Sequence, residues 1–261
     1  MCQLFLYVIQ EKFNKNNIMI DPKYNFINKI FTLIILFGLA ACTTQNETQV
    51  QDTEPQIFTQ EMQQQITPEE ALDRLKAGNK RFVNDSIKYK DYREQFEGTA
   101  EGQYPHSTVF ACIDSRSSAE HFFDLGIGEI FKARIAGNAL SEDVIGSMEF
   151  ATKAAGSKLL TVIGHTNCGA VKGAIDNVEM GHLTGLLDKI KPAMEEVSDT
   201  LQPRTSDNKE FVTAVTKAHV QNVIAEIRSE SEIISDLEEA GDIKIVGGIY
   251  DLSTGEVAFF E

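Results

Sequence analysis

The chain has 261 residues, of which 42% are hydrophobic and 24% are charged, an ordinary composition for a globular protein that can bury a core. This composition excludes wholesale disorder and leaves room for one α/β domain or two small ones. The net charge of -15 argues against a nucleic-acid partner, because binding to a phosphate backbone depends on clustered lysine and arginine, and the sequence has no basic stripe.

The N-terminal segment has the pattern of a secretory signal peptide. Lys23 and Lys29 precede an apolar run over 31–41 that is too short to span a bilayer as a helix. A short apolar run behind basic residues is typical of a cleaved export signal. We therefore expect residues 1–41 to be a signal peptide that is absent from the mature protein.

The end of this signal resembles the lipobox of bacterial lipoproteins. The apolar run closes with Leu-Ala-Ala-Cys, and in such signals cleavage precedes the cysteine, which then receives the lipids. We expect Cys42 to anchor an exported protein to a bacterial membrane, on its periplasmic or cell-surface side. A plain signal peptide and an uncleaved anchor are the alternatives, and Met19 is a candidate initiator.

A polar segment separates this signal from the expected domain. Residues 42–66 are rich in threonine, glutamine, asparagine and glutamate with hardly any apolar periodicity, which is typical of a flexible tether. At Thr67 the sequence Thr-Pro-Glu-Glu supplies an N-cap, a proline at the first helical position and a capping-box glutamate. We therefore expect one domain over 67–261.

The first helix of this domain has one apolar stripe. Leu72, Leu75 and Phe82 recur at roughly helical spacing behind Ala71. Such a stripe must pack on something, either on the domain itself or on a second subunit. We expect this N-terminal helical arm to take part in dimerisation.

Short apolar runs alternate with helical patterns along the rest of the domain. Several runs are apolar at every position, which is typical of strands that are covered on both faces. The alternation predicts crossover units and thus the α/β class, with a mainly parallel β-sheet flanked by helices. The expected strands are 108–113, 130–135, 159–163 and 243–250, with an antiparallel edge strand at 257–260, and the expected helices are 144–155 after a Ser141 cap, 183–197 and 211–228.

Two of the expected strands end in residues that can bind a metal ion. Cys112 lies at the end of strand 108–113, and His165 and Cys168 follow strand 159–163. Ligands gather at the carboxyl ends of parallel strands, so these three side chains can meet at one point. Two thiolates and one imidazole suit zinc, and three protein ligands leave a fourth position for water, as in catalytic zinc sites. A disulfide is the alternative in an exported protein.

Two charged residues follow the first cysteine. Asp114 and Arg116 stand two and four positions beyond Cys112, and both residue types avoid burial unless they are paired. They are candidates for catalysis beside the metal, and a structural salt bridge is the alternative. The other histidines lack a cysteine or acid at ligand spacing and are expected to be surface or hydrogen-bonded residues: His106, His121, His182 and His219.

Together these residues are similar to the zinc signature of the β-class carbonic anhydrases. The likeness spans most of the expected domain and rests on five site residues and two further segments: Cys112, Asp114, Arg116, His165, Cys168, 134–138 and 247–255. The resemblance implies one zinc ion per subunit on the two cysteines and His165, with Asp114 and Arg116 as the catalytic dyad. The implied enzyme is a carbonate dehydratase, a zinc lyase that reversibly hydrates carbon dioxide to bicarbonate and a proton.

The resemblance also implies a substrate pocket and an assembly. By position, Gln103 resembles the glutamine that donates a hydrogen bond to substrate, and Phe131 and Phe150 resemble the aromatic walls of the carbon dioxide pocket. The family builds its sites at subunit interfaces, so a homodimer or homotetramer is expected.

The chain departs from the family pattern in three places. Ser117-Ser118-Ala119 replaces the commoner Val-Pro-Pro-like stretch, Phe150 stands where tyrosine is frequent, and the chain has no tryptophan. One β-class subgroup has a second bicarbonate site lined by tryptophan. We therefore expect no bicarbonate inhibition of that kind.

Three rival functions stay open at this point. The same fold and metal could hydrolyse carbon disulfide or carbonyl sulfide instead. A non-catalytic surface lipoprotein that stores or senses zinc or bicarbonate is a second rival, although Asp114 and Arg116 argue against it. A thiol redox protein is a third, but Cys112 and Cys168 lack the Cys-x-x-Cys arrangement.

Overall fold

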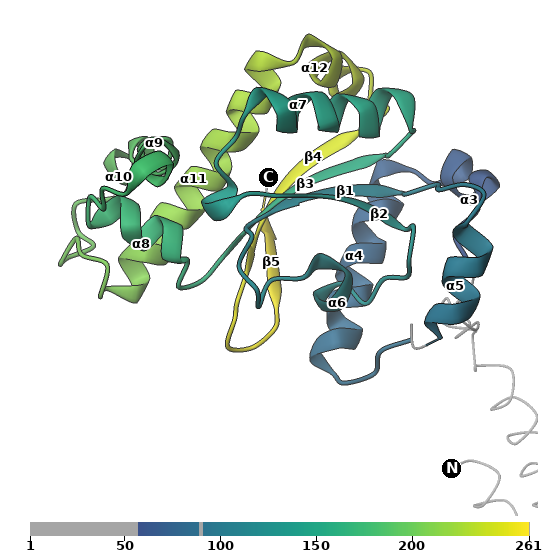
Figure 1. Cartoon of the computed structure of the whole chain (residues 1–261), viewed down its shortest axis with the longest axis horizontal. Helices are drawn as coiled ribbons and strands as arrows, with labels where there is room; N and C mark the ends of the chain where they lie inside the picture. Colours follow the sequence, from purple (N-terminus) through teal and green to yellow (C-terminus); the bar gives the residue numbers. More distant parts are fainter. Residues whose placement is uncertain (1–56, 89–90, 261) are drawn as a thin grey trace, which may run out of the picture. The chain divides into compact units, whose positions relative to one another are not determined.

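A five-stranded sheet runs through the computed structural model, which describes residues 57–88 and 91–260 (Figure 1). The strand order is β2-β1-β3-β4-β5, and the first three pairings are parallel while the last is antiparallel. This confirms the predicted mainly parallel sheet and its antiparallel edge strand. The strands are β1 (Ser107–Ala111), β2 (Ile130–Arg134), β3 (Leu159–His165), β4 (Lys244–Tyr250) and β5 (Val257–Phe260).

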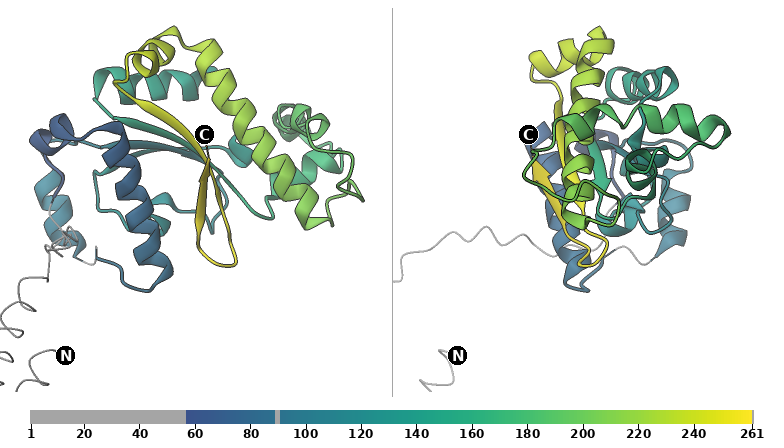
Figure 2. Two further views of the ribbon diagram at one scale, coloured as in Figure 1. Left: turned by 180° about the vertical axis from the view of Figure 1, so that it is seen from behind. Right: turned by 90° about the vertical axis from the view of Figure 1, so that its left-hand side faces the viewer.

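Helices cover both faces of this sheet. α7, α11 and α12 lie on one face, α4 and α6 lie on the other, and α8, α9 and α10 lie together at one end of the sheet (Figures 1 and 2). The helices are α3 (Gln60–Gln65), α4 (Pro68–Val83), α5 (Tyr92–Thr99), α6 (Ala119–Phe122), α7 (Glu142–Glu149), α8 (Gly169–Ile175), α9 (Gly181–Asp188), α10 (Pro192–Glu195), α11 (Lys209–Glu230) and α12 (Glu232–Glu239), with a 3-10 turn η2 (Ala136–Asn138) and a π-helical turn η3 (Phe150–Ala154).

Successive residues of the central strands are buried on opposite faces of the sheet. In β1, Val109 and Ala111 pack in the core beneath α4 and α6, while Phe110 packs in the core beneath α7 and α11. Side chains alternate between faces along a strand, so a strand covered on both faces needs apolar residues at every position. This burial explains the uninterrupted apolar runs of the sequence.

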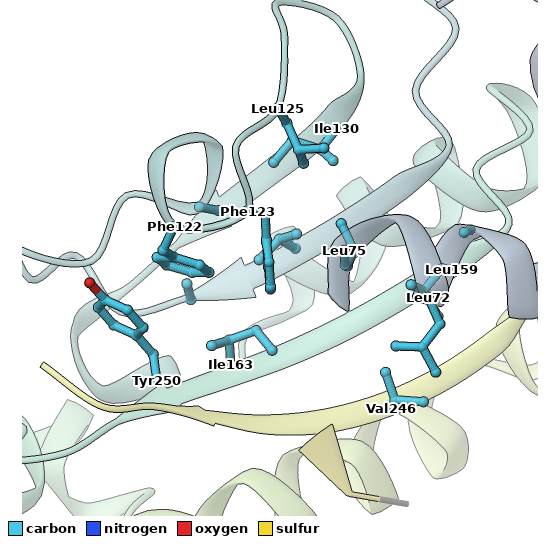
Figure 3. Packing of buried hydrophobic residues seen from close by; sticks show 14 residues of the cluster. Leu72, Leu75, Phe122, Phe123, Leu125, Ile130, Leu159, Ile163, Val246 and Tyr250 are labelled. Carbon is cyan, nitrogen blue, oxygen red and sulfur yellow. The ribbon is translucent and has the colours of Figure 1, made fainter. Parts of the chain in front are cut away.

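The N-terminal helix α4 packs on the sheet of its own chain. Thr67 and Glu70 form the predicted capping box. Leu72 and Leu75 point into the core beneath the helix, where they meet side chains of β3 and β4 (Figure 3), and Phe82 packs against the same core. Of the two partners that the stripe allowed, the structure shows the chain's own domain. The stripe is therefore no free surface for dimerisation.

The folded part of the chain begins before the expected boundary at Thr67. Gln63 in α3 is buried, and its amide Nε2 donates to the carbonyls of Pro105 and Ala155, each at 2.8 Å. A buried amide with both protons used fixes the helix to the domain. The expected tether 42–66 therefore overlaps the folded domain at its C-terminal end, a correction that follows from this one polar anchor.

Several helices differ from the sequence pattern for a physical reason. The expected helix 183–197 is divided, because α9 ends at Asp188 and α10 begins with Pro192, whose ring nitrogen has no hydrogen to continue a helix. The helical pattern expected over 144–155 begins two residues earlier in α7 and ends in η3. α5, α6, α8 and α12 were not predicted, since four to eight residues are too few for a clear helical period.

The predicted export signal and Cys42 lie outside the described residues. Within residues 57–88 and 91–260, no helix combines the length and the apolar character that crossing a membrane requires.

Candidate metal centre and catalytic dyad

Three potential metal ligands meet at the carboxyl ends of the two central strands. Cys112 follows the last residue of β1, His165 is the last residue of β3, and Cys168 is the N-cap residue of α8. The two Sγ atoms and a ring nitrogen of His165 all lie within 4.8 Å of one another, and all three residues are buried. The structure thus brings together the three ligands that the sequence suggested.

The state of His165 fits a metal ion. Its Nδ1 lies 2.9 Å from the carbonyl oxygen of Thr166, to which it can only donate. This places the free lone pair on Nε2, which is buried and has no hydrogen-bond partner among the described residues. A backbone carbonyl commonly fixes a metal-binding imidazole in this way. With two sulfur donors beside it, the donor set suits zinc.

The two cysteines are free thiols rather than a disulfide. The neighbouring Cys168 lowers the pKa of Cys112 to about 4, and the neighbouring Cys112 raises the pKa of Cys168. The backbone amides of Gly137 and Asp114 donate to Cys112 Sγ at 3.3 and 3.4 Å. These contacts favour the thiolate, which is the form that binds metal.

Asp114 and Arg116 form a forked ion pair beside the ligands. Arg116 donates from Nε to Oδ1 at 2.9 Å and from Nη2 to Oδ2 at 2.6 Å, and its backbone amide also donates to Oδ1 at 2.9 Å. The guanidinium holds the pKa of Asp114 well below its usual range. Oδ2 lies 3.8 Å from Nε2 of His165. The ion pair that was one alternative does exist, and its ionised carboxylate faces the metal ligands.

The dyad is reachable from solvent. An open cleft of about 970 Å³ lies next to Arg116 and is lined by Thr166 and Asn167 from the ligand loop and by Lys209 and Lys217 from α11. The side chain of Arg116 is half exposed at this cleft. Small solutes can therefore reach the outer side of the ion pair.

The predicted substrate residues lie at the other end of the strands. Phe131 and Phe150 make an edge-to-face contact with ring centroids 6.0 Å apart, and Gln103 shares a groove of about 580 Å³ with Phe131. In the sheet Phe131 pairs with Thr108, four residues before Cys112, which corresponds to about 13 Å along the strand. Within one chain the structure groups these three residues and separates them from the metal ligands.

The turn after β2 contributes contacts that sequence patterns did not indicate. Arg134, Gly137 and Asn138 all hydrogen-bond to the strand ends that carry the ligands. The sequence singled out 134–138 only through the resemblance; apart from that it offers a Gly-Asn pair behind a strand, and both residues have positive φ, 61° and 56°. Such a pair usually indicates a turn and no more.

The remaining histidines follow the expectation with one exception. His121 and His182 are exposed, and Nδ1 of the buried His106 lies 2.6 Å from the hydroxyl of Ser107. His219 in α11 differs, because it is buried and neither ring nitrogen has a hydrogen-bond partner among the described residues. Its ring lies beside the backbone of Gly137 and Asn138, in the turn after β2.

Comparison with known proteins identifies the family. A sequence model described as carbonic anhydrase matches residues 107–257, which include the metal ligands and the dyad. Carbonic anhydrase 2 of Mycobacterium tuberculosis is 33% identical over 189 residues, covering 72% of this chain and 90% of the relative. The carbonic anhydrase of Mycolicibacterium smegmatis is 31% identical over 191 residues, covering 73% of this chain and 92% of the relative. The chain therefore belongs to the carbonic anhydrase family.

Solved structures show to which class of carbonic anhydrase the fold belongs. A β-carbonic anhydrase of Aspergillus fumigatus superposes with a TM-score of 0.58 at 25% identity, covering 71% of this chain and 88% of that one. A tetrameric β-carbonic anhydrase of Sordaria macrospora gives a TM-score of 0.59 at 22% identity, covering 70% and 90%. The fold is that of the β class, as the resemblance of the sequence implied.

Proposed function

We propose that this chain performs the reaction of its family, the reversible hydration of carbon dioxide to bicarbonate and a proton, at a zinc ion held by Cys112, His165 and Cys168. The observation that carries the proposal is the group of three buried donors within 4.8 Å, with an ionised carboxylate beside it. A zinc ion bound there supplies Lewis acidity, which makes water a nucleophile near neutral pH.

Asp114 orients the attacking water. An ionised carboxylate only accepts hydrogen bonds, so it takes one from a water proton and turns an oxygen lone pair toward carbon dioxide. Arg116 keeps this acceptor charged and, through its two parallel hydrogen bonds, keeps it from swinging onto the metal. The two residues thus favour a nucleophile that carries a proton, such as water, and hold it in one orientation.

A second copy of the chain completes the substrate pocket in this proposal. Gln103 and Phe150 both neighbour Phe131, whose register in the sheet places it about 13 Å along the strand from Cys112 of its own chain. Phe150 is 56% exposed and contacts Phe131, so the two rings offer an apolar surface to a partner. In a homodimer, or a homotetramer built from such dimers, Gln103 polarises a substrate oxygen at the partner's metal while the two rings keep the pocket apolar.

We also infer that the mature protein is a lipoprotein. The support is the sequence alone: a basic segment, a short apolar run and Leu-Ala-Ala-Cys at its end. Mass spectrometry of the mature N-terminus should find an acylated Cys42, and Cys42→Ser should release active enzyme from the membrane. An unmodified N-terminus at any other residue contradicts this part of the proposal without touching the enzyme.

Metal analysis paired with a stopped-flow hydration assay tests the enzyme. One zinc ion per subunit and hydration that stops on chelation and returns with zinc are expected. Alanine at Cys112, His165 or Cys168 should abolish zinc binding and lower stability, because metal binding contributes to the free energy of folding. Zinc without hydration supports a storage or sensing protein, and turnover of carbon disulfide or carbonyl sulfide alone supports the hydrolase.

A further inference from the structure

The segment that follows β2 reaches across to the strand ends of the metal centre. Arg134, the last residue of β2, donates from Nε to the carbonyl of Cys112 at 2.9 Å and from Nη2 to the carbonyl of Asp114 at 2.6 Å. One guanidinium therefore grips the backbone on both sides of residue 113. This backbone carries a metal ligand at one end and the catalytic carboxylate at the other.

Asn138 hydrogen-bonds to both β1 and β3 where the pairing of these two strands ends. Its amide Nδ2 donates to the carbonyl of Phe110 at 3.0 Å and to the carbonyl of Ile163 at 3.2 Å. Each of these carbonyls lies two residues before a ligand, Cys112 in one case and His165 in the other. The pairing of β1 with β3 ends at Ile163, so the amide replaces the next rung of the sheet and sets the gap in which the ligands meet. Asn138 is 2% exposed, so water does not satisfy these carbonyls.

The backbone of this turn is left-handed at two successive residues. Asn138 has φ 56°, in a region that asparagine adopts more readily than most residues other than glycine. At Gly137, with φ 61°, a Cβ atom would lie 2.6 Å from Cδ1 of Ile190 and 2.8 Å from Cβ of Ala170. The turn is thus wedged against α8, and its Gly137 amide donates to Cys112 Sγ.

We propose that Asn138 and Arg134 are positioning residues with separate tasks. Asn138 sets the separation of the strand ends that carry Cys112 and His165, and so the geometry of the metal ligands. Arg134 sets the direction of the backbone at Asp114, and so the orientation of the dyad. The expected effect on turnover rests on the proposed function. The geometry of the metal ligands can be measured whether or not the protein hydrates carbon dioxide.

The two tasks predict different defects. Asn138→Gly tolerates the positive φ and removes both donors, so zinc affinity should fall about 10- to 100-fold, as it does when residues that support metal ligands are lost. Arg134→Met should leave zinc affinity within about twofold and lower kcat about tenfold, because the ligands stay while the carboxylate loses its alignment. Arg134→Lys should recover kcat only in part, since one ammonium cannot reproduce the planar fork.

Matched controls come from the same chain. Asn177 also has positive φ but is exposed, so Asn177→Gly makes the same backbone change away from the site. Arg204 also grips two carbonyls, those of Met194 and Val197 next to α10, so Arg204→Met removes an equivalent clamp elsewhere. Both controls should keep the zinc affinity and kcat of the parent.

The experiment measures the full-length mature protein in three ways. Competition with a chromophoric chelator gives the zinc affinity, the visible spectrum of the cobalt(II)-substituted protein reports ligand geometry, and stopped-flow hydration gives kcat and KM. The cobalt bands should shift in Asn138→Gly and not in Arg134→Met or the controls. Parent affinity and spectrum in Asn138→Gly, or parent kcat in Arg134→Met, overturns the corresponding task.

Two outcomes separate this proposal from the function it builds on. If the parent protein binds zinc without hydrating carbon dioxide, the proposed function fails, and the affinity and cobalt spectrum still decide the role of Asn138. If Asn138→Gly fails to fold, Asn138→Ser keeps a neutral polar side chain with one donor in place of two, and its cobalt spectrum should shift. An unshifted spectrum there counts against the proposal.

Discussion

At the scale of the residue, the forked ion pair of Asp114 and Arg116 predicts that the two side chains act as one unit. Asp114→Asn keeps the shape of the side chain and removes the charged acceptor, so turnover should fall by about 10² or more while zinc stays bound. Arg116→Ala should have nearly the same effect, because it frees the carboxylate to move onto the metal. Stopped-flow hydration together with metal analysis measures both quantities.

The double variant of this pair is the sharper measurement. If the two residues perform one task, the double variant should be little worse than either single variant, because residues that act together are not additive. Arg116→Lys should retain only part of the turnover, because an ammonium group cannot form the two parallel hydrogen bonds of the guanidinium. Near-full activity in either single variant, or loss of zinc in both, makes the pair structural.

His106 gives the stability of the domain a pH dependence. Burial of its ring, and then the charge of Arg74, lowers its pKa to about 3 in the folded protein. The unfolded chain, with a histidine pKa of about 6.5, binds more protons below that pH, so stability is complete above it and is lost as the pH falls. The free energy of unfolding should drop by about 1.4 kcal/mol per pH unit from this group between about pH 6 and pH 4.

Urea unfolding at a series of pH values isolates this contribution. His106→Asn keeps a polar group near Ser107 and removes the titrating ring, so its stability should fall less steeply with acidification than that of the parent. The difference between the two slopes is the quantity of interest, since carboxylates contribute equally to both. Equal slopes show that the ring becomes protonated without unfolding.

Some residues of the candidate site could be predicted from the sequence and others could not. Cys112, His165 and Cys168 were predictable because few structural roles place two thiols and an imidazole directly behind buried strands. Asn138 belongs to the segment 134–138 that carried the resemblance, but its contacts were not predictable, because they cross a gap between two strands whose pairing ends at Ile163. Such a hydrogen bond joins residues that are far apart in the sequence, so the spacing of residues along the chain does not predict it.

At the scale of the element, helix α3 depends on one polar anchor. Gln63→Ala leaves the carbonyls of Pro105 and Ala155 without a donor in a buried position, so the domain should lose about 1–3 kcal/mol of unfolding free energy. Gln64→Ala changes an exposed residue of the same helix and serves as the control. Urea unfolding curves measure both, and equal midpoints show that α3 does not support the domain.

The elements were predictable where one face or both faces of a long segment are apolar. α4 and α11 and the buried strands satisfy this condition, and their bounds differ from expectation by a few residues at most. α3 is polar except for Met62 and is held by Gln63, so its sequence has no apolar period from which a helix could be predicted. The surface that covers the apolar stripe of α4 could not be predicted either. An apolar stripe shows that a helix is covered, but it does not show whether the same chain or a second chain covers it.

At the scale of the whole molecule, the residues of the proposed site form two groups at opposite ends of the strands of one chain. The ligands and the dyad lie at the carboxyl ends of β1 and β3, while Gln103, Phe131 and Phe150 gather around the start of β2. In a dimer with twofold symmetry, each half meets the complementary half of the other chain. Such an assembly accounts for an exposed phenylalanine and a distant glutamine with a single arrangement.

Mixed dimers decide whether the site is shared in this way. Gln103→Ala damages the half that a chain donates, and Asp114→Asn damages the half that it keeps, so homodimers of either variant should have two impaired sites. A mixed dimer should contain one intact site, formed by Asp114 of the first chain and Gln103 of the second. After dissociation and random reassembly of equal amounts, half of the dimers are mixed, and hydration should recover to about a quarter of the parent value. Activity that stays at the mean of the two variants, with exchange confirmed by mass spectrometry of differently tagged chains, shows that Gln103 serves the metal of its own chain or none.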